Sequence, residues 1–551
     1  MAYRTFTTPL ISRNSFVWKN QRTLSNGIQF KSKSNDTICL IEQTVTKKLS
    51  MGDLFPQILS SIVAFLLVTQ PGINMVYSNI FLNHYEFTDV SELSWLTSIL
   101  VLCTPIGAIA IGIIMDRIGR KNAFLLTTVP LLISWSIASV ARPENMSLIY
   151  ACRFFAGIGG GMTSMVVVYV SEIAHSSYRQ VLLSLNSVFF SVGVLFATMV
   201  GSLFQWQTVN VIFFIFTAVT TVLLVIFLPE SPVWLAKFRT NRMYDARNSM
   251  RRIYPKNNQV FTEELDCLYF AAKTTTTADE TVVHAQPSHC SSCGRANRQR
   301  KRKWSGWWHS PQPPTVMRPV RVLATVFLLQ QLSGCYPVIF YAVPVMRSVA
   351  GNAAVGGPYS DMDVMVALGA VRLLTSVVAC VLSAHIGRRP LLIASSLAMA
   401  CSAALVALTC GPEAAPVWPL IGVAVFACSG SAGVLVFPWT LIGELLPVSV
   451  RAAAGAAIVA YAYTLMFVVL KAFPYAVADS GDGSGRPVAT TFAAFAAASL
   501  AMAVYVYARL PETMGKRFDE IEAHFADDSD NDDVDDDDHH LAVTINHDAC
   551  S

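Results

Sequence analysis

The chain has 551 residues, of which 53% are hydrophobic and 14% are charged, and its formal net charge at pH 7 is +4. A soluble domain carries about 25% charged residues, so this chain has too little charge to cover the surface of a soluble protein of its size. The composition therefore argues against a large soluble enzyme and predicts a chain built mainly from membrane segments.

The N-terminal segment, residues 1–54, comes before any long apolar run, so no signal peptide is visible. Its first 35 residues contain six Lys or Arg and no Asp or Glu. That composition is found in organelle transit peptides and also in cytosolic tails, and we expect a cytosolic tail. Met51 lies directly before the first apolar run and is an alternative start.

Twelve apolar runs follow, each close to the roughly 20 residues that a membrane-spanning helix requires. They cover residues 55–77, 94–114, 123–141, 149–171, 182–203, 209–228, 321–345, 364–384, 390–410, 417–439, 452–473 and 489–509. Backbone polar groups in lipid must be bonded internally, so each run is expected to be a helix. The predicted fold is an all-α membrane protein with twelve transmembrane helices.

A pattern of charged residues between these runs occurs twice. The first copy contains Asp116, Arg117, Arg120, Glu172, Arg179 and Glu230, and the second contains Arg388, Glu444, Arg451 and Glu512. In both copies a Glu precedes an Arg by seven residues, at 172 and 179 and again at 444 and 451. Such a repeat predicts two homologous six-helix halves, which is a transporter architecture.

The chain accordingly divides into five segments: a tail at 1–54, the first half at 55–235, a loop at 236–318, the second half at 319–510 and an acidic tail at 511–551. The basic loops place the Gly-Arg turns, the long loop and both termini in the cytosol by the positive-inside rule, and we expect the cell membrane. Asn145 in the sequence Asn-Met-Ser then lies outside and is a predicted glycosylation site.

The loop at 236–318 is predicted to be partly disordered, with short helices near 242–254 and 261–271. Its basic run beside Trp304 suits anionic lipid, and we expect no nucleic-acid partner. The loop also contains a single Cys-x-x-Cys, Cys290 to Cys293, which is too little for a predicted metal site. We expect no metal and no cofactor.

The repeated charges lie at the cytosolic ends of the predicted helices. We expect them to form a gate that holds the two halves together while the cavity is open outward and separates when it opens inward. The alternative is that they only fix the membrane topology.

Five segments of the sequence resemble the sugar porter family of the major facilitator superfamily, over about residues 55–520. They are Pro-Glu-Ser-Pro-Val-Trp-Leu at 229–235, Gln-Gln-Leu-Ser-Gly at 330–334, Pro438-Trp439 with Glu444 and Arg451, Pro-Glu-Thr-x-Gly-Lys at 511–516, and Arg153 with Gly157 and Gly161. The sequence around Trp439 is similar to that of the facilitated trehalose transporters. The resemblance implies a carrier that binds a sugar and changes no covalent bond, and not an enzyme.

The resemblance implies sugar contacts at Gln330, Gln331 and Trp439. Amides in an apolar helix are costly to bury unpaired, so Gln330 and Gln331 are expected to face either a sugar or a neighbouring helix. The chain departs from the family pattern at Ser187, Tyr336 and Tyr463, where the family usually has amides or Trp. Ser187 and Tyr336 are included in the predicted site, and the lost amides leave a non-sugar solute open.

Charges within the spans bear on the energetics of transport. A proton-coupled member of this family has a carboxylate in the first helix, and residues 55–77 contain none, so we predict a uniporter of trehalose or a glucose-like sugar. Arg372 lies inside the eighth span, where an Arg is either functional or paired. Arg153 and Lys471 are expected to extend to the outer interface. A proton symporter and a non-transporting sensor with the same fold remain alternatives.

Overall fold

The computed structural model describes residues 51–85, 90–238, 243–254, 314–350, 361–383, 385–410, 417–446, 451–477 and 486–512, and these residues contain helices and no strand. The first part comprises α2 (Met51–Phe65), η1 (Leu66–Val68), α3 (Thr69–His84), α4 (Val90–Ile118), α5 (Arg120–Val140), α6 (Met146–Met162), α7 (Met165–Ile173), α8 (Ser176–Leu203), α9 (Trp206–Phe227), α10 (Pro232–Phe238) and α11 (Met243–Ile253). The second comprises α14 (Pro314–Leu332), α15 (Cys335–Phe340), α16 (Ala342–Ala350), α17 (Asp361–Ser383), α18 (Arg388–Thr409), α19 (Val417–Ala432), α20 (Phe437–Leu445), α21 (Arg451–Val477) and α22 (Arg486–Arg509).

Several predictions fall outside the described residues. They concern the tail before residue 51, the helix near 261–271, the basic run beside Trp304, the Cys-x-x-Cys sequence and the acidic tail after residue 512. The helix predicted near 242–254 is present as α11.

Eleven helices of the described residues are long and apolar enough to cross a membrane, and they correspond to eleven of the twelve predicted spans. The seventh span, predicted as one helix over 321–345, is instead divided among α14, α15 and α16. The break occurs at Gly334, whose φ of +77° is left-handed and whose added Cβ would lie 2.3 Å from the ring of Phe495. Glycine is the residue that accepts such a backbone, so the chain turns here where hydropathy alone predicts a continuous helix.

Every third span is interrupted. The first is divided by η1, the fourth between α6 and α7, the seventh at Gly334 and the tenth between α19 and α20. The first, fourth and tenth spans are also the most interior, with 72%, 56% and 56% of their apolar windows buried against at most 50% for the others. Interrupted helices in the interior of a membrane bundle are where transporters place their substrate sites.

The outer surface of the bundle is apolar. On α9 the exposed side chains Ile215, Val219, Val222 and Ile226 recur every three or four residues, so they share one helix face. Leu374, Val378 and Val381 form a similar stripe on α17. Apolar stripes of this length would be unfavourable in water and are favourable against lipid tails, as in a multi-pass membrane protein.

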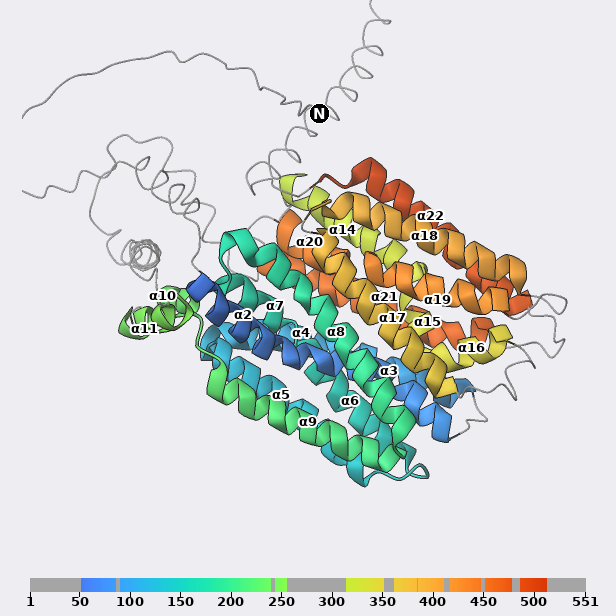
Figure 1. Ribbon diagram of the computed structural model, residues 1–551, viewed down its shortest axis with the longest axis horizontal. Coiled ribbons are helices and arrows are strands. Elements are labelled where there is room, and N and C mark those ends of the chain that lie inside the picture. The colour runs from blue at the N-terminus through green and yellow to red at the C-terminus, as the bar shows by residue number, and fades with distance from the viewer. Residues whose placement is uncertain are drawn as a thin grey trace, which may run out of the picture. The chain divides into compact units, whose positions relative to one another are not determined.

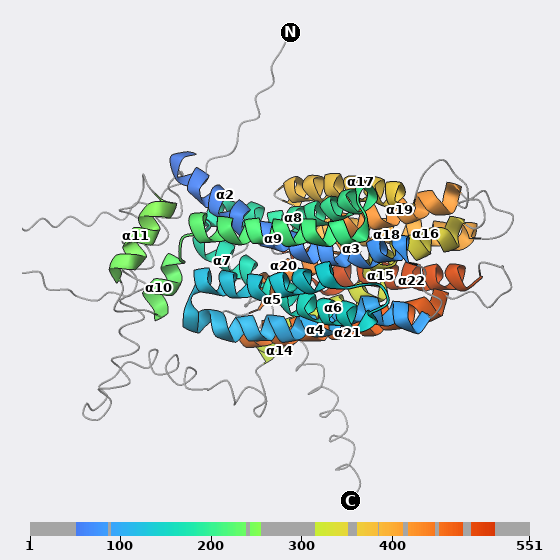
Figure 2. The ribbon, with the colours of Figure 1, turned by 90° about the horizontal axis from the view of Figure 1, so that it is seen from below.

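The two groups of helices meet along several pairs. Figure 1 shows the helices from α2 to α9 (blue to green) beside those from α14 to α22 (yellow to red). Helix α17 packs on α8 and α21 packs on α4, as Figure 2 also shows, and α3 contacts α15 and α16. Helices α10 and α11 pack on each other, and α11 also contacts α2.

Candidate functional site

The two Gly-Arg turns are built alike. Helix α5 begins directly after Gly119 and α18 directly after Gly387, and these glycines have φ values of +97° and +89°. A Cβ at Gly119 would lie 2.7 Å from Glu230 Oε2, and one at Gly387 would lie 3.0 Å from Glu512 Oε1. Both turns therefore need glycine for the backbone conformation and for the close approach of a carboxylate.

In both turns the carboxylate caps the helix that follows. Glu230 Oε1 accepts from the backbone N–H groups of Arg120 at 2.7 Å and Lys121 at 3.2 Å. Glu512 Oε1 accepts from the backbone N–H of Arg388 at 3.4 Å. The first N–H groups of a helix have no partner within it, so these carboxylates satisfy them and complement the helix dipole. Burial raises the pKa of the Glu230 carboxyl above its usual value.

Each copy of the motif also contains a buried Arg paired with a Glu. Arg120 Nη2 lies 2.6 Å from Glu172 Oε1, and Arg120 Nη1 lies 2.8 Å from Asp116 Oδ1. Arg388 forms an ion pair with Glu444. Only 6% of each Arg side chain is exposed, so these are pairs in a largely desolvated environment, where geometry and hydrogen bonding decide their strength.

These ion pairs connect helices of the same half. Arg120 joins α5 to α4 and α7, and Arg388 joins α18 to α20. Glu172 pairs with Arg120, whereas Arg179, seven residues after Glu172, donates to the Ala174 carbonyl at 3.4 Å. The ion pairs of Arg120 and Arg388 do not link the two halves, and the predicted gating role of these charges stays a prediction.

Two further residues of the predicted gate, Arg117 and Arg451, lie at the ends of helices. Arg117 lies exposed at the end of α4. Arg451 begins α21, but its side chain falls outside the described residues.

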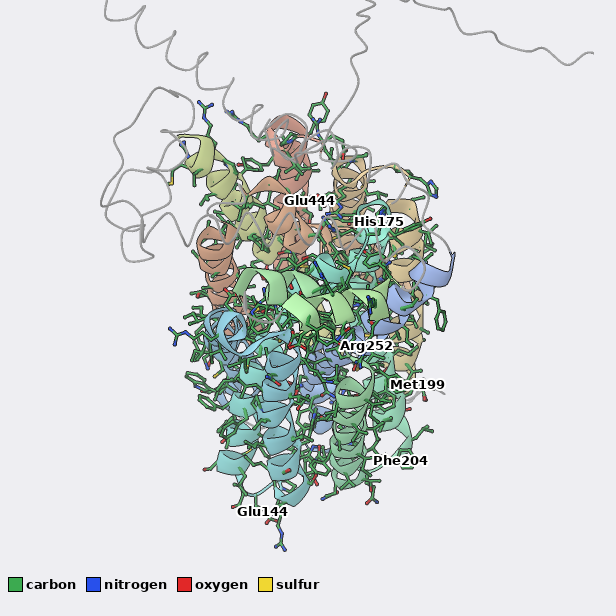
Figure 3. All side chains as sticks on the ribbon, turned by 90° about the vertical axis from the view of Figure 1, so that its left-hand side faces the viewer. Glu144, His175, Met199, Phe204, Arg252 and Glu444 are labelled. Atoms are coloured by element: carbon green, nitrogen blue, oxygen red, sulfur yellow. The ribbon has the colours of Figure 1, made fainter. Side chains whose placement is uncertain are left out.

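Figure 3 places Glu444 and His175 toward one end of the bundle and Glu144 and Phe204 toward the other.

The end opposite the Gly-Arg turns is joined by an amide that sequence reasoning missed. Asn79 on α3 is fully buried, and its Nδ2 donates to the Ile339 carbonyl on α15 at 3.1 Å. Its Oδ1 accepts from the backbone N–H of Val343 on α16 at 3.4 Å. One amide thus connects both halves, and its only signal in the sequence is a lone polar residue in an apolar run.

The two glutamines of the seventh span have different roles in the structure. Gln330 Nε2 donates to the Val434 carbonyl at 2.6 Å, which ties the seventh span to the break in the tenth. Gln331 Nε2 lies 3.4 Å from Gln330 Oε1, and Gln331 Oε1 is buried without a partner among the described residues. Gln331 therefore has unused hydrogen-bonding capacity, while Gln330 connects helices.

A group of aromatic residues joins the seventh span to the tenth and eleventh. Trp439 Nε1 donates to Tyr336 Oη at 2.9 Å. The Trp439 ring lies 4.9 Å from the ring of Phe327 and 5.1 Å from that of Tyr463, measured between centroids. Tyr336 and Tyr463, which depart from the family pattern, are thus the residues that hold the tryptophan, and an indole face of this kind suits the apolar face of a sugar ring.

Ser187, the fifth predicted contact, lies half-buried on α8. It lines a small pocket of about 10 Å³ together with side chains of the second half, among them Ser376 and Phe437. Ser191 Oγ lies 2.8 Å from Ser376 Oγ, and Ser184 Oγ lies 3.4 Å from Ser383 Oγ. Here the halves meet through hydroxyl groups.

The intramembrane cations differ from one another. The expectation that Arg153 extends to the outer interface is wrong, because the side chain is 0% exposed and donates to the carbonyls of Leu96 and Asn74 and to Ser78 Oγ. Lys471 Nζ lies 3.8 Å from the centroid of the Trp95 ring, in a cation–π contact. Arg372 is 5% exposed and leaves Nε and Nη1 without hydrogen-bond partners.

Asn145, the predicted glycosylation site, is exposed in the short turn before α6. Its side chain is accessible, and glycosylation stays a prediction. Among the described residues no group of His, Cys, Asp or Glu has the arrangement of a metal site.

Comparison with known proteins agrees with this architecture. The family described as "Sugar (and other) transporter" matches residues 62–525. The chain is 27% identical over 442 residues to the facilitated trehalose transporter Tret1 of Bombyx mori, covering 78% of each chain, and 26% identical over 442 residues to the sugar transporter ERD6 of Arabidopsis thaliana, covering 79% and 80%.

The fold is similar to that of a solved transporter. The structure of the major facilitator superfamily proton:xylose symporter XylE bound to 6-bromo-6-deoxy-D-glucose aligns with a TM-score of 0.66 at 18% identity, covering 86% of this chain and 100% of that one. With the repeated motif, the interrupted interior helices and the matched family, the chain has the major facilitator fold, belongs to the sugar (and other) transporter family and is a multi-pass membrane carrier, not an enzyme.

Proposed function

We propose that the protein is a uniporter that moves trehalose or a glucose-like sugar down its gradient across the cell membrane by alternating access. Two observations carry this proposal: Tyr336 positions the indole of Trp439 by a hydrogen bond of 2.9 Å, and Gln331, in the same span as Tyr336, has a buried amide oxygen without a described partner. Amides bind sugar hydroxyls and an indole face packs on the ring.

The passive mechanism is supported by the first span, which has no Asp or Glu over residues 55–77. A carboxylate inside the membrane is the usual carrier of a coupled proton. The proton-coupled alternative has support from the fold alone, because the structural neighbour XylE is described as a proton:xylose symporter.

The proposed cycle uses contacts at both ends of the bundle. Asn79 closes the end opposite the Gly-Arg turns, and the motif clusters keep each half rigid at the other end. We propose that this second end faces the cytosol, with both termini, and that Asn145 is glycosylated outside. The division into halves at 55–235 and 319–510 is part of the same proposal.

Uptake of labelled trehalose and glucose into oocytes tests the function. Wild type is expected to show saturable uptake that a protonophore leaves unchanged, while Trp439→Ala loses most of it. The matched control is Trp418→Ala, since Trp418 is 57% exposed on the lipid side of α19. Absence of saturable sugar uptake by wild type overturns the substrate proposal, and collapse on adding the protonophore overturns the uniport proposal.

A further inference from the structure

Arg372 is a buried cation that forms no ion pair with any carboxylate among the described residues. Only 5% of its surface is exposed, and its Nε and Nη1 have no hydrogen-bond partner among the described residues. Its guanidinium lies over the face of Phe190, with Cζ 5.2 Å from the ring centroid. No described Asp or Glu forms an ion pair with it, so the protein itself leaves the charge largely uncompensated.

Arg153, another buried arginine without a described carboxylate partner, has hydrogen bonds that Arg372 lacks. Arg153 is 0% exposed, and it too has no carboxylate partner among the described residues. Its Nε, Nη1 and Nη2 each donate, at 3.2 Å to the Leu96 carbonyl, 2.9 Å to the Asn74 carbonyl and 2.9 Å to Ser78 Oγ. Arg153 is therefore a structural cross-link, and Arg372 is not held in the same way.

The position of Arg372 connects it with the predicted sugar site. It lies on α17 of the second half, and Phe190 lies on α8 of the first, so the guanidinium sits where the halves meet. Its guanidinium lies close enough to Tyr336 and Cys335 on α15 and to Cys428 on α19 to interact with them electrostatically. Tyr336 in turn holds Trp439.

A buried charge that is unpaired in the free protein is unfavourable, and such residues in membrane proteins mark substrate pathways. An arginine with donors to spare recognises oxyanions through charge-assisted hydrogen bonds. We infer that this site accepts a sugar that carries a carboxylate, a hexuronate or an aldonate, with the carboxylate on Arg372 and the sugar against Trp439 and Gln331. The inference rests on the proposed function, since it uses the same site, and it names the substrate class more narrowly.

The first test measures ligand binding by thermal unfolding of the purified full-length protein in detergent. Glucuronate is expected to raise the melting temperature of wild type and of Arg142→Gln, an exposed Arg-to-Gln control, but not of Arg372→Gln. Arg372→Lys should keep part of the shift. An equal shift from chloride overturns the assignment to a sugar acid, because then a small inorganic anion is sufficient.

The same variants distinguish a ligand-binding role from a structural one. Without ligand, Arg372→Gln is expected to melt at or above the wild-type temperature, because it removes an uncompensated charge. Arg153→Gln is expected to melt well below it. A fall for Arg372→Gln as large as that for Arg153→Gln overturns the inference, because it assigns Arg372 a structural role.

The second test is uptake of labelled glucuronate and labelled glucose in oocytes. Wild type is expected to take up glucuronate saturably, with competition by gluconate and none by the methyl ester of glucuronate, and Arg372→Gln should reduce this uptake about tenfold or more. Glucose uptake without glucuronate uptake or binding overturns the inference and leaves the proposed function intact. Glucuronate uptake that needs Arg372, without glucose uptake, supports the inference and overturns only the neutral-sugar part of the proposed function. If wild type carries neither, the proposed function falls, and the thermal shift with glucuronate alone decides the inference.

Discussion

The indole nitrogen of Trp439 donates a hydrogen bond to the hydroxyl of Tyr336 at 2.9 Å, which fixes a residue of the tenth span against one of the seventh. Both residues come from spans that the chain interrupts nearby. The orientation of the indole face thus depends on the Tyr336 hydroxyl.

Replacing Tyr336 by Phe leaves the Trp439 Nε1–H without its acceptor in a buried environment. Such a loss costs about 1–3 kcal/mol, and we expect it to appear as a KM for sugar raised about fivefold or more with a smaller change in maximal rate. The control is Tyr463→Phe, which keeps the ring against Trp439 and removes a hydroxyl that makes no hydrogen bond to it. Equal effects of the two variants would show that the Tyr336 hydroxyl does not position the indole.

Alanine at Gly119 or Gly387 forces a Cβ onto a left-handed backbone and against a capping carboxylate. Each variant is expected to lower the free energy of unfolding by about 2 kcal/mol or more, seen as a lower melting temperature of the purified protein. Gly112→Ala is the matched control, because a Cβ at this position inside α4 would have nothing within 4 Å of it. Gly112→Ala should leave the melting temperature unchanged or slightly raised. A fall in melting temperature as large as that for Gly119→Ala or Gly387→Ala would contradict the requirement for glycine in the two turns.

The buried carboxyl of Glu230 should give stability a characteristic pH dependence. Burial raises its pKa above the usual 4.5, so between the two values the folded state binds more protons than the unfolded state. The free energy of unfolding contributed by this group therefore falls as the pH rises through that window, and is constant above the raised pKa. The melting temperature of wild type minus that of Glu230→Gln, measured from about pH 4 to pH 8, should fall with pH. A rise would mean that the backbone donors of Arg120 and Lys121 outweigh burial.

Loss of the Asn79 side chain should open the end of the bundle that it joins. Asn79→Ala removes both hydrogen bonds to the second half and leaves the Ile339 carbonyl and the Val343 N–H without those partners. Distances between spin labels at Glu144 and Ser348, both exposed at that end, are expected to shift toward longer values in a cysteine-free background. Asn210→Ala is the control, since its Nδ2 donates to the Ala138 carbonyl within one half. An unchanged distribution for Asn79→Ala, or the same shift for Asn210→Ala, would contradict the role of Asn79.

The sequence predicts most of the fold because lipid imposes one strong rule on it. Hydropathy locates eleven spans to within a few residues, and the repeated charges indicate the two halves. The break in the seventh span is not predicted, because hydropathy does not report backbone conformation. Gly334 has a left-handed φ, and the ring of Phe495 leaves no room there for a Cβ. That information lies in a contact between residues far apart in the chain.

The candidate site is predicted less completely for the same reason. Motif residues such as Glu230 and Arg120 are visible in the sequence, but their capping and pairing partners are set by packing. Arg153 is misjudged because carbonyls of Asn74 and Leu96, on other helices, satisfy it. Asn79 gives too weak a signal, since a lone amide in an apolar run is as consistent with packing as with a contact between halves.

The separation of ion pairs from the interface between halves has a consequence for salt. The pairs of Arg120 and Arg388 lie inside their own halves, while the described contacts between halves include neutral hydrogen bonds such as Ser191 with Ser376 and the cation–π contacts of Lys471 and Arg372. Dissolved ions screen interactions between charges and have little effect on neutral hydrogen bonds. Added salt should therefore leave the hydroxyl contacts between the halves, such as Ser191 with Ser376, nearly unchanged.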